Sequence, residues 1–251
     1  MKTYRRYLRN QSLPGENEII TDQEKGLPFL PMQKPYTEGG KLIDLIPSEK
    51  FTVGRLPLIN LIRSRESRRK YSSKSISLEE LSFLLWSTQG VTKISQNGMY
   101  SRRTVPSGGA MHPFETYLLV NNVEEIAKGI YRYLPIEHKL LKEPTTERHK
   151  TDQIGDICDG QEFVAEGAVV FVWTARCYRT EWRYGDDSLK DILISVGHIC
   201  QNLYLACESI GAGTCAILSY QQESLDELIG IDGDEEIALY LAPVGKIRGN
   251  G

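Results

Sequence analysis

The segment 168–173, Ala-Val-Val-Phe-Val-Trp, constrains the fold of this chain more than any other. Its residues are apolar throughout and rich in β-branched and aromatic side chains, which favours a strand. A strand that is apolar at every position, rather than at alternate positions, is buried on both faces. The sequence therefore predicts a central strand within residues 166–174, with helices above and below its sheet.

Helical periodicity is strongest over residues 188–209. One apolar stripe there is formed by Leu189, Ile192, Val196, Ile199, Leu203 and Ala206. Ser77 and Glu80 have the spacing of a capping box, which predicts a helix start, and Gly90 predicts its end. Further strands are predicted over 115–121, 129–133, 214–219 and 237–244. Helices and strands alternate without a repeating βαβ order, so we predict an α+β fold.

The length of 251 residues suits one large domain, or a domain with an arm. Residues 1–56 are polar and interrupted by prolines, so we interpret them as an N-terminal arm with little regular structure, followed by a domain over 57–251. An apolar patch, Leu27–Met32, packs on the body or on a partner subunit, or belongs to a disordered tail.

The composition argues against several classes of protein. A net charge of −3 argues against a nucleic-acid partner, which needs a clustered basic face. The sequence contains no run of 18 apolar residues, which a membrane span would need. The N-terminus lacks the apolar core of a secretory signal. The five cysteines form no Cys-x-x-Cys pair, which argues against a zinc or iron–sulfur site. Their odd number favours a reducing, cytoplasmic location.

A short basic segment runs over residues 63–70, Arg-Ser-Arg-Glu-Ser-Arg-Arg-Lys. It is too short to cover a nucleic-acid duplex, but it suits a single phosphate group, for which arginine forks are good ligands. The alternative is a solvated helix face.

A second segment, Pro106-Ser107-Gly108-Gly109, precedes the strand predicted over 115–121. It carries no bulky side chain, so its backbone can approach a flat or anionic ligand closely. The alternative is an ordinary loop. His112 follows this turn, and its side chain has either a structural role or a functional one.

A third block contains Trp182-Arg183-Tyr184-Gly185, then residues 196–206, then residues 210–215. In their order and spacing the three blocks resemble the nitroreductase superfamily of FMN flavoproteins, and within it the SagB/ThcOx-type dehydrogenase branch. The resemblance covers roughly residues 57–247. It implies a mixed β-sheet wrapped by helices and a homodimer with shared FMN sites.

The resemblance also implies cofactor-binding residues. It places Arg65, Glu66, Ser67 and Arg69 on the family's first FMN motif. Glu66 stands where the family usually has a basic residue or a histidine, and a carboxylate cannot hold a phosphate; it could instead orient an arginine.

Further cofactor contacts follow from the same resemblance. Pro106, Ser107 and Gly108 correspond to a segment that reaches FMN from the second subunit. The backbone of Ala216, Ile217, Leu218 and Ser219 corresponds to the turn beside flavin N5. Lys246 and Arg248 would add phosphate charge or belong to a solvated tail.

Arg183 and Tyr184 are the candidate catalytic residues. SagB-type dehydrogenases have a Lys-Tyr pair here that is linked to catalysis. Dehydrogenation sends a hydride to flavin N5 and a proton to a base. A tyrosine with its ordinary pKa of about 10 is a poor base at neutral pH, and a nearby cation favours the tyrosinate. Arginine supplies charge but exchanges no proton. Alternatively, Trp182 and Tyr184 cover the core while Arg183 extends into solvent.

The sequence thus predicts an FMN-dependent oxidoreductase, and two reactions compete. One is SagB-like dehydrogenation of azoline rings on a modified peptide to azoles, with oxygen reoxidising the flavin. The other is electron transfer from NAD(P)H to a nitro compound or a quinone. A flavin-binding scaffold without activity is a third possibility, to which the departures at Glu66, His112 and Arg183 point.

Overall fold

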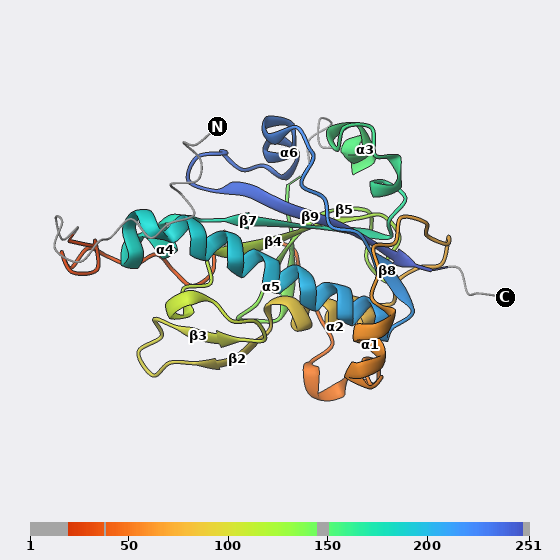
Figure 1. The fold of residues 1–251 in the computed structure, drawn as a ribbon, viewed down its shortest axis with the longest axis horizontal. Helices are drawn as coiled ribbons and strands as arrows, with labels where there is room; N and C mark the ends of the chain where they lie inside the picture. The colour runs from red at the N-terminus through yellow and green to blue at the C-terminus, as the bar shows by residue number, and fades with distance from the viewer. Residues whose placement is uncertain (1–19, 38, 145–150, 248–251) are drawn as a thin grey trace.

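The computed structural model describes residues 20–37, 39–144 and 151–247. Its centre is a seven-stranded sheet in the order β1-β6-β5-β4-β7-β9-β8 (Figure 1). These strands are β1 (Leu42–Asp44), β4 (Phe114–Val120), β5 (Gly129–Leu134), β6 (Lys139–Lys142), β7 (Val169–Ala175), β8 (Ala212–Thr214) and β9 (Ile237–Lys246). A separate hairpin consists of β2 (Val91–Ile94) and β3 (Ser101–Arg103).

Strand β7 is the central strand that the apolar run predicts. It pairs with β4 on one side and β9 on the other, and all of its residues are buried. Phe171 and Trp173 belong to one hydrophobic core, whereas Val170 and Val172 belong to a second core on the opposite face. The prediction of a strand buried on both faces is confirmed.

Helices cover both faces of the sheet, as Figure 1 shows. On one face lie α2 (Leu78–Gln89) and α5 (Ser188–Ser209), and on the other lie α3 (Ile154–Ile157) and α6 (Gln222–Ile229). The remaining α-helices are α1 (Leu58–Ser64) and α4 (Tyr178–Tyr184). The predicted α+β fold is confirmed. Strand pairing in the described sheets is antiparallel, and parallel contacts occur there as isolated bridges.

Short 3₁₀ helices complete the described structure: η2 (Ser48–Lys50), η3 (Gly108–Ala110), η4 (Thr151–Gln153), η5 (Glu162–Val164) and η6 (Gly185–Asp187). The capping box at the start of α2 is present, because the Ser77 hydroxyl accepts from the Glu80 N–H and the Glu80 carboxylate accepts from the Ser77 N–H. Gly90 is the C-cap, as predicted. Within the described residues, no helix combines the length and hydropathy that a membrane crossing requires.

Helix α5 differs from its prediction at Leu189. The rest of the predicted stripe is buried, but Leu189 is 41% exposed. It joins Leu193 and Ile194 on an outward face. Since α5 is apolar on two sides, periodicity alone could not tell which stripe faces the sheet.

The outward apolar residues of α1 and α5 are together called the α1–α5 face. They are Leu58, Ile59, Ile62, Leu189, Leu193 and Ile194, with exposed fractions of 41–60%. The two helices contact each other. Leu189, Leu193 and Ile194 lie within two turns of one helix, and contiguous exposed apolar patches are typical of surfaces that bind another protein.

The strand predicted over 214–219 is shorter and earlier than expected. Strand β8 ends at Thr214, and within the rest of the predicted range Ile217 forms an isolated bridge with Leu241. The short strands β1, β2, β3 and β6 were not predicted. Each has three or four residues, too few for a period to be recognised, and long-range pairing decides them.

The N-terminal segment is held to the rest of its own chain over the apolar patch 27–32. The Trp182 indole N–H donates to the Leu27 carbonyl at 2.8 Å, and Arg179 donates to the Pro31 carbonyl at 2.9 Å. The Phe29 and Trp182 rings lie 5.0 Å apart. Residues 1–19 lie outside the described residues, and the division of the chain at residue 56 stays a prediction.

Candidate functional site

The basic segment lies along the edge of β8. Helix α1 ends at Ser64, and Ser67 then forms a parallel bridge with Thr214 while the Arg68 N–H donates to the Thr214 carbonyl at 2.9 Å. A Cβ on Gly213 would lie 2.6 Å from Cδ of Arg68, so glycine permits this close approach. The segment is therefore extended at a sheet edge and is not a solvated helix face.

Tyr204 of α5 joins three of the predicted cofactor residues. Its hydroxyl lies 3.0 Å from Oγ of Ser67 and accepts from the Ala216 N–H at 2.9 Å. The Arg65 guanidinium lies over its ring, 5.4 Å from the centroid. We call Arg65, Ser67, Tyr204 and Ala216 the tyrosine cluster. The sequence analysis gave Tyr204 no role, although a phenol in an apolar helix was the available signal.

Charge pairing separates the cations near this cluster into two groups. Arg68 pairs with Glu66 at 2.8 Å and with Glu208 at 3.1 Å. Lys246 pairs with Glu80 and donates to the Ile210 carbonyl at 2.7 Å. The predicted site residues Glu66 and Lys246 are thus engaged with other protein groups.

Arg65 and Arg69 form the second group. The Arg69 guanidinium lies 5.9 Å from the centroid of the Phe163 ring, which the sequence analysis did not single out. Among the described residues, no carboxylate lies within ion-pair distance of Arg65 or Arg69. Their positive charges are therefore available for an anionic ligand. Arg248 lies outside the described residues.

The turn after β8 continues from the tyrosine cluster. Ile217 exchanges backbone hydrogen bonds with Leu241, which fixes the turn to β9. Leu218 is 73% exposed, and the Ser219 hydroxyl donates to the Asp159 carboxylate. The structure thus brings Ala216 to the cluster, while Leu218 and Ser219 lie at the surface beyond it.

The predicted loop and the predicted catalytic pair meet at Gly109. This glycine has a φ of +56°, and a Cβ there would lie 2.6 Å from the Tyr184 hydroxyl and 3.2 Å from Nη1 of Arg183. The Ser107 hydroxyl accepts from the His112 N–H at 3.1 Å and keeps its own proton to donate. We call Pro106–Gly109 with Arg183, Tyr184 and Asp191 the loop cluster.

Arg183 and Tyr184 are neighbours whose side chains also meet in space. The Arg183 guanidinium lies 5.6 Å from the centroid of the Tyr184 ring. Helix α4 ends at Tyr184, and Gly185 turns the chain with a φ of +51°. Trp182 is buried, whereas Arg183 and Tyr184 are half-buried beside the loop. Of this run, Trp182 therefore covers the core.

Asp191, in the first turn of α5, supports the loop from the other side. Its carboxylate lies against the Gly108 backbone, and a Cβ on Gly108 would lie 2.4 Å from Oδ1. Burial raises the pKa of Asp191, against the lowering by the Gly108 N–H and by His198. The sequence analysis missed Asp191, because nothing local distinguishes it from other charged residues at a helix start.

His112 is buried and in a left-handed conformation, with a φ of +44°. Burial, with a smaller effect of the Arg103 charge, lowers the pKa of His112 to about 3. A histidine with that pKa is neutral at physiological pH, which suits a structural role.

The two clusters lie near opposite ends of α5. Asp191 belongs to the loop cluster and Tyr204 to the tyrosine cluster, so the helical rise separates them by roughly 20 Å along the axis. Figure 1 shows the same arrangement, with α4 meeting one end of α5 and α1 lying near the other. Within one chain the two clusters are therefore separate.

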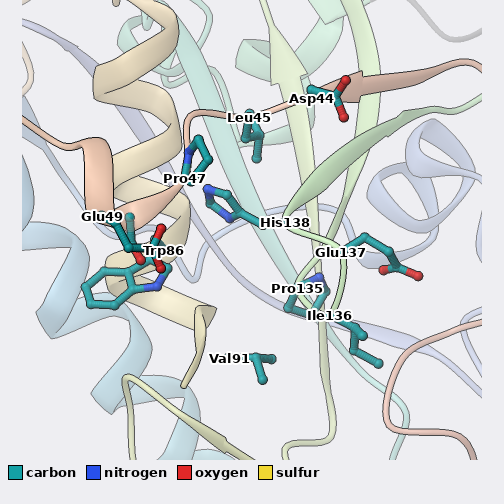
Figure 2. A pocket seen from close by; sticks show the side chains of 11 residues that line it. Asp44, Leu45, Pro47, Glu49, Trp86, Val91, Pro135, Ile136, Glu137 and His138 are labelled. Atoms are coloured by element: carbon teal, nitrogen blue, oxygen red, sulfur yellow. The ribbon is translucent and has the colours of Figure 1, made fainter. Parts of the chain in front are cut away.

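A pocket of about 490 Å³ lies elsewhere, between the segment after β1, the end of α2 and the β5–β6 turn (Figure 2). Its lining includes Trp86, His138 and Glu49 but none of the predicted site residues. His138 is bound through both ring nitrogens, to the Tyr133 hydroxyl at 2.7 Å and the Ile46 carbonyl at 2.9 Å.

Comparison with known proteins identifies the family. The model of the nitroreductase family matches residues 62–246, and the chain belongs to this family. Over 194 residues the chain is 31% identical to MJ1384 of Methanocaldococcus jannaschii, which is provisionally named a nitroreductase; the match covers 77% of this chain and 93% of that protein. Nitroreductases normally bind FMN and are commonly homodimers.

Two further similar proteins are not named as nitroreductases. The chain is 27% identical to the trifolitoxin-processing protein TfxB of Rhizobium leguminosarum bv. trifolii, over 57% of this chain but only 39% of that protein. A chain of the E. coli microcin synthetase McbBCD complex, with truncated pro-MccB17 bound, has the same fold. It has a TM-score of 0.62 and 19% identity, over 95% of this chain and 85% of that one.

Proposed function

We propose that this protein is an FMN-dependent dehydrogenase that oxidises a modified-peptide substrate at sites shared between two subunits. The observation that carries the proposal is the contact of Tyr184 and Arg183 with Gly109. It joins the candidate catalytic pair to the loop that, in the resembled family, reaches the flavin. Bound FMN would supply the acceptor for a hydride at its N5 atom.

The tyrosine cluster, together with Arg69 of the same extended segment, is suited to the FMN phosphate. Arg65 and Arg69 offer unpaired guanidinium groups, and the Ser67 hydroxyl lies between them in sequence. Bidentate hydrogen bonds from arginine are the usual means of holding a phosphate. Arg68 and Lys246 already have carboxylate partners, so we assign the phosphate to Arg65 and Arg69.

A homodimer would unite the two clusters, each of which we interpret as half of a flavin site. Each chain separates its own clusters by roughly 20 Å along α5, so we infer that the Pro106–Gly108 segment completes the flavin site of the other subunit. The α1–α5 face is the surface we assign to this interface, since its apolar side chains are exposed in the single chain. An obligate interface of this kind buries about 2,000 Å² or more.

Tyr184 is the residue we assign as the proton acceptor. Removing two hydrogens from an azoline ring releases one as a proton and one with its electron pair. The Arg183 guanidinium lies 5.6 Å from the centroid of the Tyr184 ring and so places a positive charge beside the assigned base. The Tyr184 hydroxyl lies against Gly109 of the loop, which limits its movement on that side.

The comparisons support a peptide substrate. One similar protein is named for trifolitoxin processing and the other for microcin synthesis with a pro-form bound. The second covers 95% of this chain, beyond the residues that the family model matches.

The second candidate function is an NAD(P)H-dependent nitro or quinone reductase. The observation favouring it is the 31% identity to MJ1384, which extends over nearly the whole of that protein. A hydride from NAD(P)H needs no protein base, so this reaction would not use Tyr184 as a proton acceptor.

Anaerobic flavin reduction separates the two functions. A thiazoline peptide, NADH and NADPH are each mixed with the holoprotein, and flavin absorbance is followed. For the dehydrogenase, Tyr184→Phe keeps FMN but lowers peptide-driven reduction by roughly 10²–10⁴-fold, the usual contribution of a general base. Reduction by NAD(P)H with no loss in Tyr184→Phe would establish the reductase instead. A flavin that no donor reduces would indicate a scaffold.

A further inference from the structure

We propose that Asp191 is a positioning residue whose carboxylate holds the Pro106–Gly109 loop of its own chain in the shape that completes the partner subunit's flavin site. The proposal rests on the proposed function, because it needs a flavin site shared between subunits. Asp191 acts through the loop and has no assigned contact with substrate or cofactor.

The contacts place the loop backbone directly on the carboxylate. The Asp191 carboxylate lies against the Gly108 backbone, because a Cβ on Gly108 would lie 2.4 and 2.6 Å from the two carboxylate oxygens. On the next residue, Tyr184 and Arg183 occupy the space that a Cβ of Gly109 would need. Three side chains from α4 and α5 therefore fix two consecutive glycines.

The position of the Asp191 carboxylate is energetically unfavourable. Oδ2 of Asp191 is buried and has no hydrogen-bond partner among the described residues. Burial raises the pKa of Asp191, although its place in the first turn of α5 favours negative charge. Buried polar atoms without partners are rare in folded proteins and often accompany a function. Holding the loop is the function that the Gly108 contact offers.

Single variants test whether the side chain at position 191 holds the loop. Asp191→Asn keeps the size of the side chain and an oxygen that can accept a hydrogen bond beside the Gly108 backbone, whereas Asp191→Ala removes both. We expect Asp191→Ala to weaken FMN binding about tenfold or more and Asp191→Asn to stay within about threefold of the wild type. The matched control is Asp186→Ala, an exposed acid in η6, which should bind FMN as the wild type does. Equal losses in the Asn and Ala variants overturn the proposal.

Hybrid dimers test whether Asp191 acts on the partner's site. One hybrid carries Asp191→Ala on one chain and Arg69→Ala on the other, and the second hybrid carries both changes on one chain beside a wild-type chain. Bound FMN is counted at a concentration that fills the wild-type sites only. If Asp191 serves the partner's site, the first hybrid has both defects in one site and binds one FMN per dimer, whereas the second binds none.

The reverse pattern would show that Asp191 acts on its own chain's site, and it overturns the proposal. Sedimentation of each hybrid confirms that it is a dimer, so a folding defect is not mistaken for lost FMN. The proposed function fails in a different way. In that case the wild-type dimer binds no FMN, or Arg69→Ala binds it as tightly as the wild type, before any Asp191 variant is compared.

Discussion

Gly109→Ala is the substitution that most directly tests the contact between the loop and Tyr184. Two costs follow from the structure. The backbone at Gly109 has a φ of +56°, where an L-residue with a side chain loses about 1–2 kcal/mol relative to glycine. In addition, the new methyl would lie 2.6 Å from the Tyr184 hydroxyl, closer than non-bonded atoms approach, so the phenol or the loop must move.

Gly98 provides a matched control for the first cost. It lies in the turn of the β2–β3 hairpin with a φ of +68°, and a Cβ there meets nothing within 4 Å. We therefore expect Gly98→Ala and Gly109→Ala to share a loss of about 1–2 kcal/mol, or roughly 2–8 °C in Tm for a chain of this size. Only Gly109→Ala displaces Tyr184.

The assay is anaerobic, peptide-driven flavin reduction by stopped flow, with a thermal melt of each variant. A misplacement of about 1 Å at a catalytic group can cost roughly 10²-fold in rate, which is the loss expected for Gly109→Ala alone. In the double variant with Tyr184→Phe, the clashing oxygen is gone, so the Tm loss should be smaller than the sum of the single losses. Equal flavin-reduction rates in the two alanine variants would refute the contact as a catalytic requirement.

Three further outcomes are expected. Arg65→Ala and Arg69→Ala each weaken FMN binding by about 2–5 kcal/mol, because the phosphate loses its charged partner; wild-type retention of FMN in both, measured by fluorescence titration, contradicts the phosphate assignment. Leu193→Asp places a charge on the α1–α5 face, so sedimentation at low micromolar concentration should detect monomers that have lost FMN. The pKa of His112 is about 3 in the fold against 6.5 in the unfolded chain, so its share of stability is complete above pH 6.5 and falls by up to about 1.4 kcal/mol per pH unit as the pH drops towards 3; urea unfolding of His112→Asn should lack that part of the slope.

Local sequence determines the parts of the fold that were predicted correctly. The apolar side chains of the run 168–173 are all removed from water only if the strand lies between two layers of the fold. Strand β7 is indeed buried on both faces. Ser77 and Glu80 interact within one helical turn, so their capping box is visible in four residues. The capping box joins residues that are close in sequence, and the burial of β7 depends on a property that every residue of the segment shares.

The candidate site depends on distant residues and was predicted only as separate blocks. Ser67 and Tyr204 meet across 137 positions of sequence, and neither carries a local sign of the other. Asp191 reaches Gly108 only because α5 and the loop pack together. The resemblance to a family could mark the loop and the Arg183–Tyr184 pair, but it could not show that they share Gly109. That contact is a property of the folded chain.

The length of helix α5 is the reason why we expect a symmetric pair of chains to unite the two clusters. Asp191 and Tyr204 lie near its two ends, and the outward residues Leu193 and Ile194 lie between them. The midpoint falls at Gly197, an exposed glycine with no atom within 4 Å of where a Cβ would be, so a second helix could approach closely there. A two-fold axis at this point would run the two α5 helices antiparallel and bring the loop cluster of each chain to the tyrosine cluster of the other. The same contact would bury the apolar face and complete both flavin sites, so we expect dimerisation and FMN binding to be lost together in Leu193→Asp.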